Sequence, residues 1–285
     1  MTYLSVEVIS IGTCNMDFIL KVPRFVEIDS EMYIETINTS PGGSALNFAV
    51  NLSRNGIKTG LIARLGNDDY GKIILSKVSR ENMDISRCLT MNDQTGMAFI
   101  SVDKGGKRSI YSFMGANAKL NLLKEDIDYI KSSPFTHLTG VYWEVAYDVA
   151  QYAPKLSFSP GSLLSSYGVD KLKRVLKKTE LLFLNEKEVN ILTGEKTYEG
   201  SQLLLEEGVS NVIVTRGKEG AIIYSRDNTI SASTKKVKAL DTTGAGDAFA
   251  AGFVFKWLKG EKEEKCLEFA NQSAFRCLNI LGGIN

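Results

Sequence analysis

Histidine and paired cysteines are scarce in this chain of 285 residues. His137 is the only histidine, and its apolar neighbours Phe135 and Leu138 predict a position in the core, which argues against histidine-based acid/base chemistry. The four cysteines are scattered without a CxxC pair, so neither a zinc site nor a disulfide framework is expected. Reduced thiols of this kind are typical of cytoplasmic proteins.

A strong charge imbalance and a long apolar run are also absent. The net charge is +1, which gives no broad field to attract nucleic acid or an acidic membrane. No apolar window approaches the length of a membrane span, and the first residues lack a signal-peptide pattern. With 44% apolar and 24% charged residues, the composition is that of a soluble globular protein. We therefore expect a cytoplasmic protein that binds small molecules and has no nucleic-acid or membrane partner.

Two well-known phosphate-binding motifs are missing as well. The sequence has no GxxxxGK[ST] motif, and Gly244-Ala245-Gly246 lacks the third glycine of a dinucleotide fingerprint, because Phe249 stands there. Residues 241–253 nevertheless join this glycine-rich turn to an apolar helix. Its backbone amides could bind an anion, and Asp247 in the first helical turn could accept a proton from an attacking hydroxyl. The alternative is a turn in which Asp247 only stabilises the helix start.

Further polar residues follow the first predicted strand. Residues 6–12 are expected to form a buried strand, and the loop at 13–17 places Asn15 and Asp17 at its carboxyl end. Ligands of open α/β sheets bind at that edge, so both residues are candidate substrate contacts. A local Asx turn is the alternative explanation.

A glycine pair precedes the first predicted helix. After a short strand expected over residues 31–37, Pro41-Gly42-Gly43 turns the chain into a helix that ends near Gly56. Asn47 lies in the first turns of this helix. It either faces the same site as Gly42 and Gly43 or is simply solvated.

Strands and helices then alternate, which predicts a parallel sheet. An apparent hairpin at residues 97–102 and 107–113 interrupts this pattern, and we interpret segments of about 30–39 and 96–114 as an inserted lid. The hairpin carries apolar residues on both faces: its first strand has Ala98, Ile100 and Val102 on one face and Met97 and Phe99 on the other, and the second has Ile110 and Met114 opposite Tyr111 and Phe113. A lid that covers a small ligand needs apolar residues on only one of its faces. We therefore predict a homodimer joined through the lid strands, with packing of the lid on its own domain as the alternative.

Two later motifs lie where strands end. Asn185 follows a buried strand, and Glu188 three residues later completes a capping-box pattern, which is the local explanation of both residues. Thr215, Gly217 and Gly220 lie between apolar runs at 212–214 and 221–223, where a hairpin turn would explain them.

Four of these motifs resemble, in the same order, those of the ribokinase-like (PfkB) family of carbohydrate kinases: GGSALN, NEKE, VTRGKEG and DTTGAGDAF. The resemblance runs from the first strand to the last helix. It implies an α/β fold, namely a ribokinase-like three-layer sandwich with a mostly parallel central sheet and a small inserted β-lid. We expect one such domain over residues 1–285.

The resemblance also implies a role for each motif. The anion hole would be formed by Gly244, Ala245 and Gly246, with Asp247 as the catalytic base. ATP and Mg²⁺ would be the cofactors, and Asn185 and Glu188 would organise the metal. Nucleotide contacts would come from Asn185, Thr215, Gly217, Gly220 and Thr243. The acceptor would be bound by Asn15, Asp17, Gly42, Gly43, Asn47, Phe99 and Tyr111.

These roles predict ATP-dependent phosphotransfer to a primary hydroxyl of a sugar. A nucleoside kinase, a vitamin-alcohol kinase and a non-catalytic sugar sensor are the alternatives. Residues 159–162 (SPGS) stand where acid-sugar kinases of the family carry an arginine, which disfavours a carboxylated sugar. Relatives often continue beyond Gly282-Gly283 into a loop that touches the base or a monovalent cation, so K⁺ is left open as a cofactor.

Overall fold

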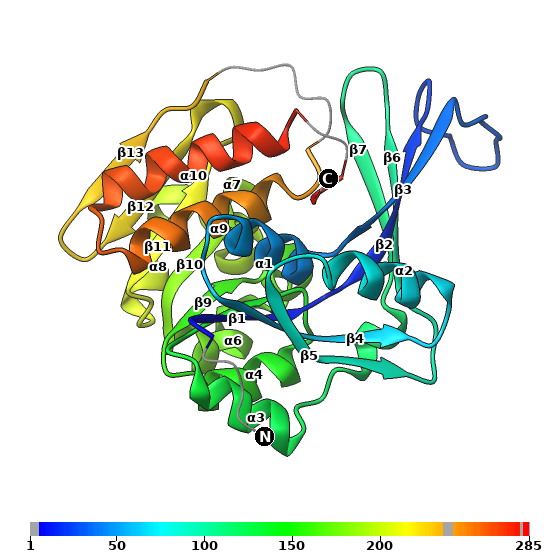
Figure 1. Cartoon of the computed structure of the whole chain (residues 1–285). Coiled ribbons are helices and arrows are strands. Elements are labelled where there is room, and N and C mark those ends of the chain that lie inside the picture. The colour runs from blue at the N-terminus through cyan, green and yellow to red at the C-terminus, as the bar shows by residue number, and fades with distance from the viewer. Residues whose placement is uncertain (1–5, 236–241, 280–281, 285) are drawn as a thin grey trace.

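The computed structural model describes residues 6–235, 242–279 and 282–284. Its main feature is a nine-stranded sheet with the order β13-β12-β11-β10-β9-β8-β1-β4-β5 (Figure 1). In chain order these strands are β1 (Val8–Gly12), β4 (Thr59–Gly66), β5 (Met83–Met91), β8 (Phe135–Thr139), β9 (Leu156–Ser159), β10 (Thr179–Asn185), β11 (Asn211–Thr215), β12 (Ala221–Ser225) and β13 (Thr229–Ala232).

Neighbouring strands from β11 to β5 run parallel, whereas β12 and β13 are added antiparallel at one end. The predicted, mostly parallel central sheet is thus confirmed. The chain order runs outward in both directions from β1, which pairs with β4 on one side and β8 on the other. Such a reversal leaves a crevice at the carboxyl ends of the strands, where ligands of open α/β sheets bind.

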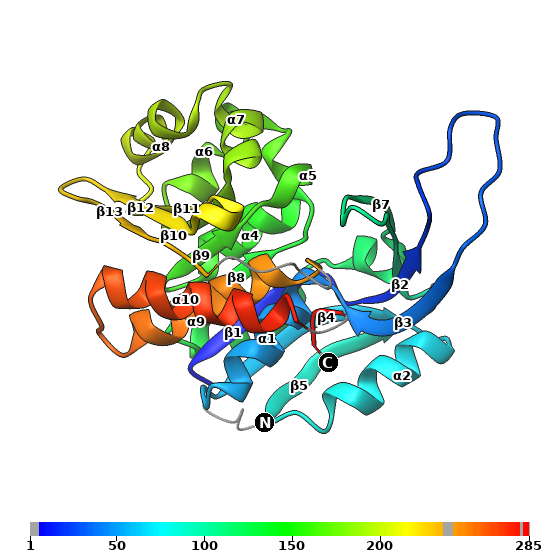
Figure 2. The same ribbon diagram turned by 90° about the horizontal axis from the view of Figure 1, so that it is seen from above.

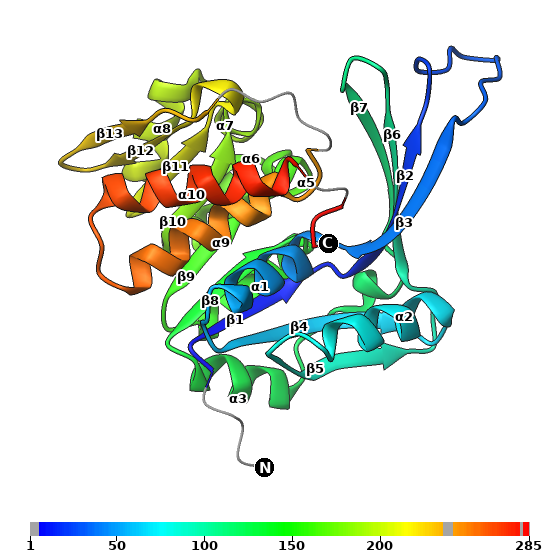
Figure 3. The same ribbon diagram turned by 45° about the horizontal axis from the view of Figure 1, so that its top comes forward.

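Helices cover both faces of this sheet (Figure 3). One face is covered by α1 (Ser44–Arg54), α2 (Asp69–Val78), α9 (Ala245–Leu258) and α10 (Glu263–Cys277). The other is covered by α3 (Lys124–Ser132), α4 (Trp143–Tyr152), α5 (Gly161–Ser165), α6 (Gly168–Leu176), α7 (Glu186–Thr193) and α8 (Thr197–Glu206). Apolar side chains of the helices and the sheet form separate clusters on the two faces, so the predicted three-layer sandwich is confirmed.

A second, four-stranded sheet has the order β3-β2-β6-β7 and is called the small sheet below. Its strands are β2 (Asn15–Lys21), β3 (Thr36–Gly42), β6 (Gly96–Val102) and β7 (Arg108–Phe113). In Figures 1 and 3 it extends away from the main sheet on the side of α2. The hairpin predicted at residues 97–102 and 107–113 is present as β6 and β7.

Two expectations about the first part of the chain are wrong. Residues 15–17 do not lie in a loop, because Asn15 begins β2, which pairs with β3 on one side and β6 on the other. The strand expected at 31–37 begins only at Thr36. Residues 22–35 contain no helix or strand and project away from the rest of the molecule (Figure 2).

His137 lies in the core, as predicted. It is 1% exposed, and its ring stacks on Phe48 with 3.7 Å between the ring centroids. Burial lowers the pKa of His137 to about 3, so the imidazole is neutral at physiological pH. None of the four cysteines, all in the described part of the chain, forms a disulfide. Across the described ranges, no helix combines the length and the apolar content needed to cross a bilayer.

Candidate active site

The carboxyl ends of parallel strands bring polar residues into one row. The register aligns Gly12 at the end of β1 with Thr139 of β8, and Thr139 with Ser159 of β9. Asn185 at the end of β10 is aligned with Thr215 at the end of β11. The two predicted nucleotide contacts Asn185 and Thr215 therefore lie side by side at the edge where a ligand is expected.

The glycine-rich stretch forms the start of α9. Gly244 has a φ of 75°, in the left-handed region that favours glycine, and a Cβ there would lie 2.6 Å from the Cα of Gly283. The amide of Ala248 donates to the carbonyl of Gly244 across 2.8 Å, so the preceding amides have no partner within the helix. The amide of Ala245 makes a long contact of 3.4 Å to the carbonyl of Thr242, before the helix. A Cβ at Gly246 would meet no atom of the described residues within 4 Å, so among these residues nothing packs on Gly246 at the start of the helix. The residues present fit a bound phosphate. Asp241 lies outside the described residues.

Asp247 lies in the first turn of α9 and is half-buried. The Nδ2 of Asn47, in α1, donates to the Oδ2 of Asp247 across 2.9 Å. Burial raises the pKa of Asp247 to about 7, although hydrogen bonds from Asn47 and Ser44 and the charge of Arg108 favour the ionised form. The negative charge of Glu188 raises the pKa further. A carboxylate with this pKa exchanges a proton near neutral pH, as a general base requires.

A positive charge from the small sheet reaches the same region. Arg108, on β7, donates from Nη1 to the Oγ1 of Thr242 across 2.8 Å. Its charge lowers the pKa of both Asp247 and Glu188. Arg108 is not among the residues predicted from the sequence, because no local spacing relates it to a threonine 134 positions away.

Asn185 and Glu188 form the predicted capping box at the start of α7. The Oδ1 of Asn185 accepts from the amide of Glu188 at 2.9 Å, and the Oε2 of Glu188 accepts from the amide of Asn185 at 3.0 Å. Burial raises the pKa of Glu188, although these hydrogen bonds and the charge of Arg108 act against the rise. A cation beside this carboxylate would relieve the cost of its burial, and Mg²⁺ is commonly held by one or two carboxylates together with phosphates and water. The residues present therefore fit a magnesium ion, and the cap uses only one of the two carboxylate oxygens of Glu188.

Asp17, Gly42 and Gly43 meet where the small sheet leaves the main sheet. Asp17 is 3% exposed. A Cβ on Gly42 would lie 2.0 Å from the Oδ2 of Asp17, so the glycine makes room for this carboxylate. Gly43 has a φ of 98°, and a Cβ there would lie 2.6 Å from the carbonyl oxygen of Thr13. Both glycines are required by packing around Asp17 and the start of β2.

Asn15 is held by Asn117, in the 3-10 helix η1 (Gly115–Lys119). The Nδ2 of Asn117 donates to the Oδ1 of Asn15 across 2.8 Å, and its Oδ1 accepts from the amide of Cys14 across 2.9 Å. The buried Asn117 thus fixes the junction between β1 and β2. Asn117 is not among the residues predicted from the sequence, because a single asparagine after Gly115-Ala116 has no spacing that sets it apart.

A comparison with known protein families matches residues 6–279 to the pfkB family of carbohydrate kinases. The chain belongs to this family. It is 32% identical to an ATP-dependent ribose-1-phosphate kinase of Halopiger xanaduensis, over 93% of this chain and 90% of that protein. It is 30% identical to a nucleoside kinase of Methanothermobacter thermautotrophicus, over 94% of this chain and 88% of that protein. Among solved structures, a ribokinase from Thermotoga maritima is 27% identical, with a TM-score of 0.87 over 98% of this chain and 95% of that one.

The family match confirms the resemblance drawn from the four motifs and the ribokinase-like α/β fold. Members of this family are phosphotransferases that act on a hydroxyl group, and this pfkB kinase is an enzyme of that class. The relatives named above include a sugar-phosphate kinase and a nucleoside kinase.

In this pfkB kinase, two aromatic residues that were predicted to bind the acceptor do not share a face of the small sheet with Asp17. The register pairs Asp17 with Ala98 and Phe18 with Phe99, and neighbouring residues of a strand point to opposite faces. Phe99 pairs with Tyr111 across the hairpin and stacks on Phe18, with 5.0 Å between the ring centroids. Phe99 and Tyr111 therefore lie on the face of the small sheet that is opposite to Asp17.

The residues predicted for the nucleotide side of the kinase lie in two turns. Thr215, Gly217 and Gly220 join β11 to the antiparallel β12, partly as the 3-10 helix η2 (Gly217–Glu219), so the hairpin turn is present. Gly220 has a φ of 92°, and a Cβ there would lie 2.1 Å from the carbonyl oxygen of Ala232. Thr243 precedes α9, and its carbonyl accepts from the Sγ of Cys277 across 3.4 Å.

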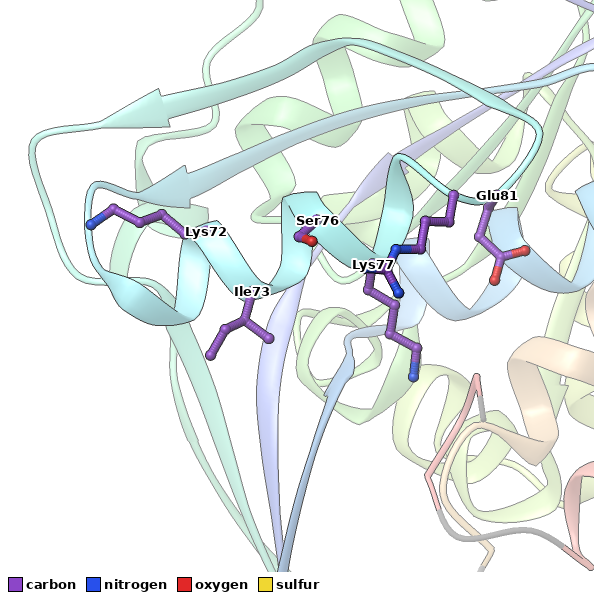
Figure 4. Close-up of a pocket in the computed structure, with 6 residues that line it drawn as sticks. Lys72, Ile73, Ser76, Lys77 and Glu81 are labelled. Carbon is purple, nitrogen blue, oxygen red and sulfur yellow. The ribbon is translucent and has the colours of Figure 1, made fainter.

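Two surface hollows lie outside the residues predicted from the sequence. One, of about 390 Å³, is lined by Ser233, Thr234, Lys235, Glu268, Asn271, Gln272, Phe275 and Arg276. It lies between α10 and the residues that directly follow β13. The other, of about 590 Å³, is lined by Lys72, Ile73, Ser76, Lys77, Arg80 and Glu81 on and just after α2 (Figure 4).

Proposed function

We propose that the protein transfers the γ-phosphoryl group of ATP to a primary hydroxyl of a sugar, in the manner of a ribokinase or a fructokinase. The observation that carries the proposal is the carboxylate of Asp247, which has a pKa of about 7 and lies in the helical turn that begins with the glycine-rich stretch. A base and an anion site share one turn of α9. A hydroxyl that contacts Asp247 would therefore face a phosphoryl group bound at Gly244, Ala245 and Gly246.

Phosphoryl transfer has a loose transition state, so positioning and charge neutralisation contribute more than proton abstraction. Asp247 orients the acceptor hydroxyl and takes its proton. The amides of residues 244–246 donate hydrogen bonds to the phosphoryl oxygens, and Arg108 brings a positive charge from β7. We regard residues 1–285 as one catalytic unit in which the small sheet serves as the lid.

Magnesium, when bound, neutralises charge on the phosphate oxygens. Asn185 and Glu188 would hold this ion, in part through water. Thr215, Gly217, Gly220 and Thr243 would line the nucleotide, and the hollow between β13 and α10 would take its base. The name of the ribose-1-phosphate kinase relative supports ATP as the donor. A monovalent cation stays open as an additional cofactor.

On the acceptor side, Asp17 and Asn15 offer a carboxylate and an amide, groups that suit the hydroxyls of a sugar. Gly42 and Gly43 let the chain pass close to them. A nucleoside kinase is the second candidate, because a protein of that name is 30% identical to this chain. A pentose and a nucleoside share a ring with hydroxyl groups, so the same side chains could hold either.

A panel of sugars and nucleosides, each assayed with ATP and Mg²⁺, tests the proposal. We expect at least one free sugar to be phosphorylated by the wild type and not by the Asp247→Asn variant. Phosphorylation of nucleosides alone would establish the second candidate. Binding of ATP by a folded protein without turnover of any acceptor in the panel would contradict both.

We also propose that the small sheet joins two copies of this chain. Its face opposite Asp17 carries Phe99, Tyr111 and Phe113, which are 38%, 74% and 44% exposed. Adjacent exposed aromatic residues on one face mark an interaction surface, and a symmetric pair is the commonest arrangement for identical chains. In such a dimer the small sheet of one subunit would help to close the site of its partner.

A further inference from the structure

Asn47 contacts the carboxylate of Asp247 directly, although the two residues are 200 positions apart in the chain. The resemblance to the kinase family assigned Asn47 to the acceptor. In the structure the side chain is 3% exposed, and its Nδ2 donates to the Oδ2 of Asp247 across 2.9 Å. The donor capacity of Asn47 is thus directed at the proposed base.

The carbonyl oxygen of the same side chain is buried and has no hydrogen-bond partner among the described residues. A buried acceptor without a partner costs stability, so the side chain is held in this position at a cost and its donor bond works against that cost. A hydrogen bond to an ionised carboxylate is among the stronger ones in proteins. Asn47 makes a bond of this kind to Asp247.

Gly283 confines the amide of Asn47 from the other side. A Cβ on Gly283 would lie 2.4 Å from the Oδ1 and 2.5 Å from the Nδ2 of Asn47. The Nδ2 of Asn51 donates to the backbone carbonyl of Asn47 at 2.8 Å and to that of Gly283 at 3.4 Å, which ties the two segments together. Ile284, the next residue, is buried in the core beneath α1. The amide therefore has little room to turn away from Asp247.

We propose that Asn47 is a positioning residue whose amide holds the Asp247 carboxylate in the orientation that the acceptor hydroxyl needs, with Gly283 backing the amide. This inference rests on the proposed role of Asp247 as the base. The other groups that act on Asp247 are Ser44 of α1, Glu188 of α7 and Arg108 of β7. All three are retained when Asn47 alone is changed.

Asn47→Leu keeps the volume of the side chain and removes its donor. We expect kcat to fall on the order of tenfold to a hundredfold, while the KM for the acceptor changes by less than about threefold. The acid limb of the pH dependence of kcat should move upward by about one pH unit, because the lost hydrogen bond no longer favours the ionised carboxylate. Asn55→Ala is the matched control: it removes an amide that donates to the backbone carbonyl of Asn51 across 2.8 Å in the same helix, and it should leave both quantities unchanged.

Gly283→Ala tests the backing contact without a change in Asn47 or Asp247. The added methyl group displaces the amide, so this variant should show the same fall in kcat and the same displacement of the acid limb. It also keeps the proposal testable if the Asn47 variants do not fold, which thermal unfolding would reveal. A Gly283→Ala variant that folds and has wild-type kcat and pH dependence would contradict the backing role.

A measurement without substrate separates this inference from the proposed function. The carboxyl group of Asp247 can be titrated by ¹³C NMR in the wild type and in Asn47→Leu, with Asp247→Asn identifying its resonance. A higher carboxyl pKa in Asn47→Leu supports the contact even if no acceptor in the panel is phosphorylated. An unchanged carboxyl pKa, with wild-type kcat and a raised acceptor KM, would overturn the proposal and leave Asn47 as an acceptor contact only.

Discussion

At the scale of single residues, the property that suits Asp247 to catalysis also costs stability. Burial raises its pKa from 3.8 to about 7. A carboxyl group whose pKa is raised by folding contributes stability that is fully present below the unfolded-state pKa and is lost as the pH rises through the folded-state pKa. The wild-type protein should therefore lose stability between about pH 4 and pH 7 on account of this residue. Because Asp247 keeps some exposure to solvent, the loss is smaller than for a fully buried group.

The variant Asp247→Asn should lower kcat on the order of 10²- to 10⁴-fold, the range for loss of a positioned base. Asparagine removes the charge and can still accept the hydrogen bond from Asn47. We therefore expect the variant to melt at a higher temperature than the wild type at pH 8, with a smaller difference at pH 4. Turnover assays and thermal unfolding at both pH values check this. If Asp247→Asn turned over at the wild-type rate, Asp247 would not be the base. If the variant and the wild type melted at the same temperature at pH 8, burial of the ionised Asp247 would not cost stability.

Glu188 has two roles that a single substitution separates. Glu188→Gln keeps an oxygen that can accept from the amide of Asn185, so the cap at the start of α7 is retained, while the charge is lost. We expect a higher Mg²⁺ concentration for half-maximal activity, with little change in melting temperature or in the acceptor KM. Glu186→Gln, in the same helical turn, is the control with the same charge change. Lost stability with unchanged metal dependence would leave Glu188 as a cap alone.

At the scale of elements, strand β7 connects the small sheet to the start of α9 through Arg108 and Thr242. Arg108→Ala should lower kcat on the order of 10²-fold, because a positive charge beside the phosphoryl group is removed. The acid limb of the kcat profile should also move to higher pH, since the charge of Arg108 lowers the pKa of Asp247. Lys107→Ala removes the same charge one residue earlier and should have little effect. Similar losses in both variants would point to the net charge of the strand rather than to this contact.

Local patterns explain which elements could be predicted from the sequence. The strands β1, β4 and β8 are buried along their whole length and carry apolar residues on both faces, and they lie where the sequence places them. Strand β2 was missed, because it follows β1 after only two residues and has polar residues at its start. Strand β5 was also missed, since its residues are mostly half-buried and show neither alternation nor a continuous apolar run.

The same limit applies to the site. Asn185 ends β10, and Asp17 lies in β2 shortly after the end of β1, so the rule that ligands bind at the carboxyl ends of strands is sufficient to select both residues. No rule of this kind selects Asn117 or Arg108, because each forms its hydrogen bond with a residue more than a hundred positions away. Asn47 was selected, but its bond to Asp247 forms only when α1 and α9 pack together, so no spacing in the sequence reveals it.

At the scale of the whole molecule, the small sheet has two different faces. Ile19, Ala98 and Ile100 form a buried cluster on the face that carries Asp17. The opposite face is exposed at Phe99 and Tyr111, which the register places next to each other. The alternation predicted from the sequence is thus present in the structure, and the exposed face is the surface that we assign to a second copy of the chain.

The variant Tyr111→Lys places a charge in the middle of this exposed face, far enough in the sequence from Asp247 and Asn185 to leave their segments unchanged. If the face joins two subunits, the wild type should sediment as a dimer at micromolar concentration and the variant as a monomer, because an unpaired charge is costly in a buried interface. Activity should fall with the loss of the dimer, since each small sheet would no longer be supported by its partner. Tyr198→Lys is the matched control, because Tyr198 is also an exposed tyrosine, 58% accessible, but lies on α8. A wild-type protein that is strictly monomeric and fully active would rule this interface out. If Tyr198→Lys and not Tyr111→Lys dissociated the dimer, the interface would involve α8 rather than the small sheet.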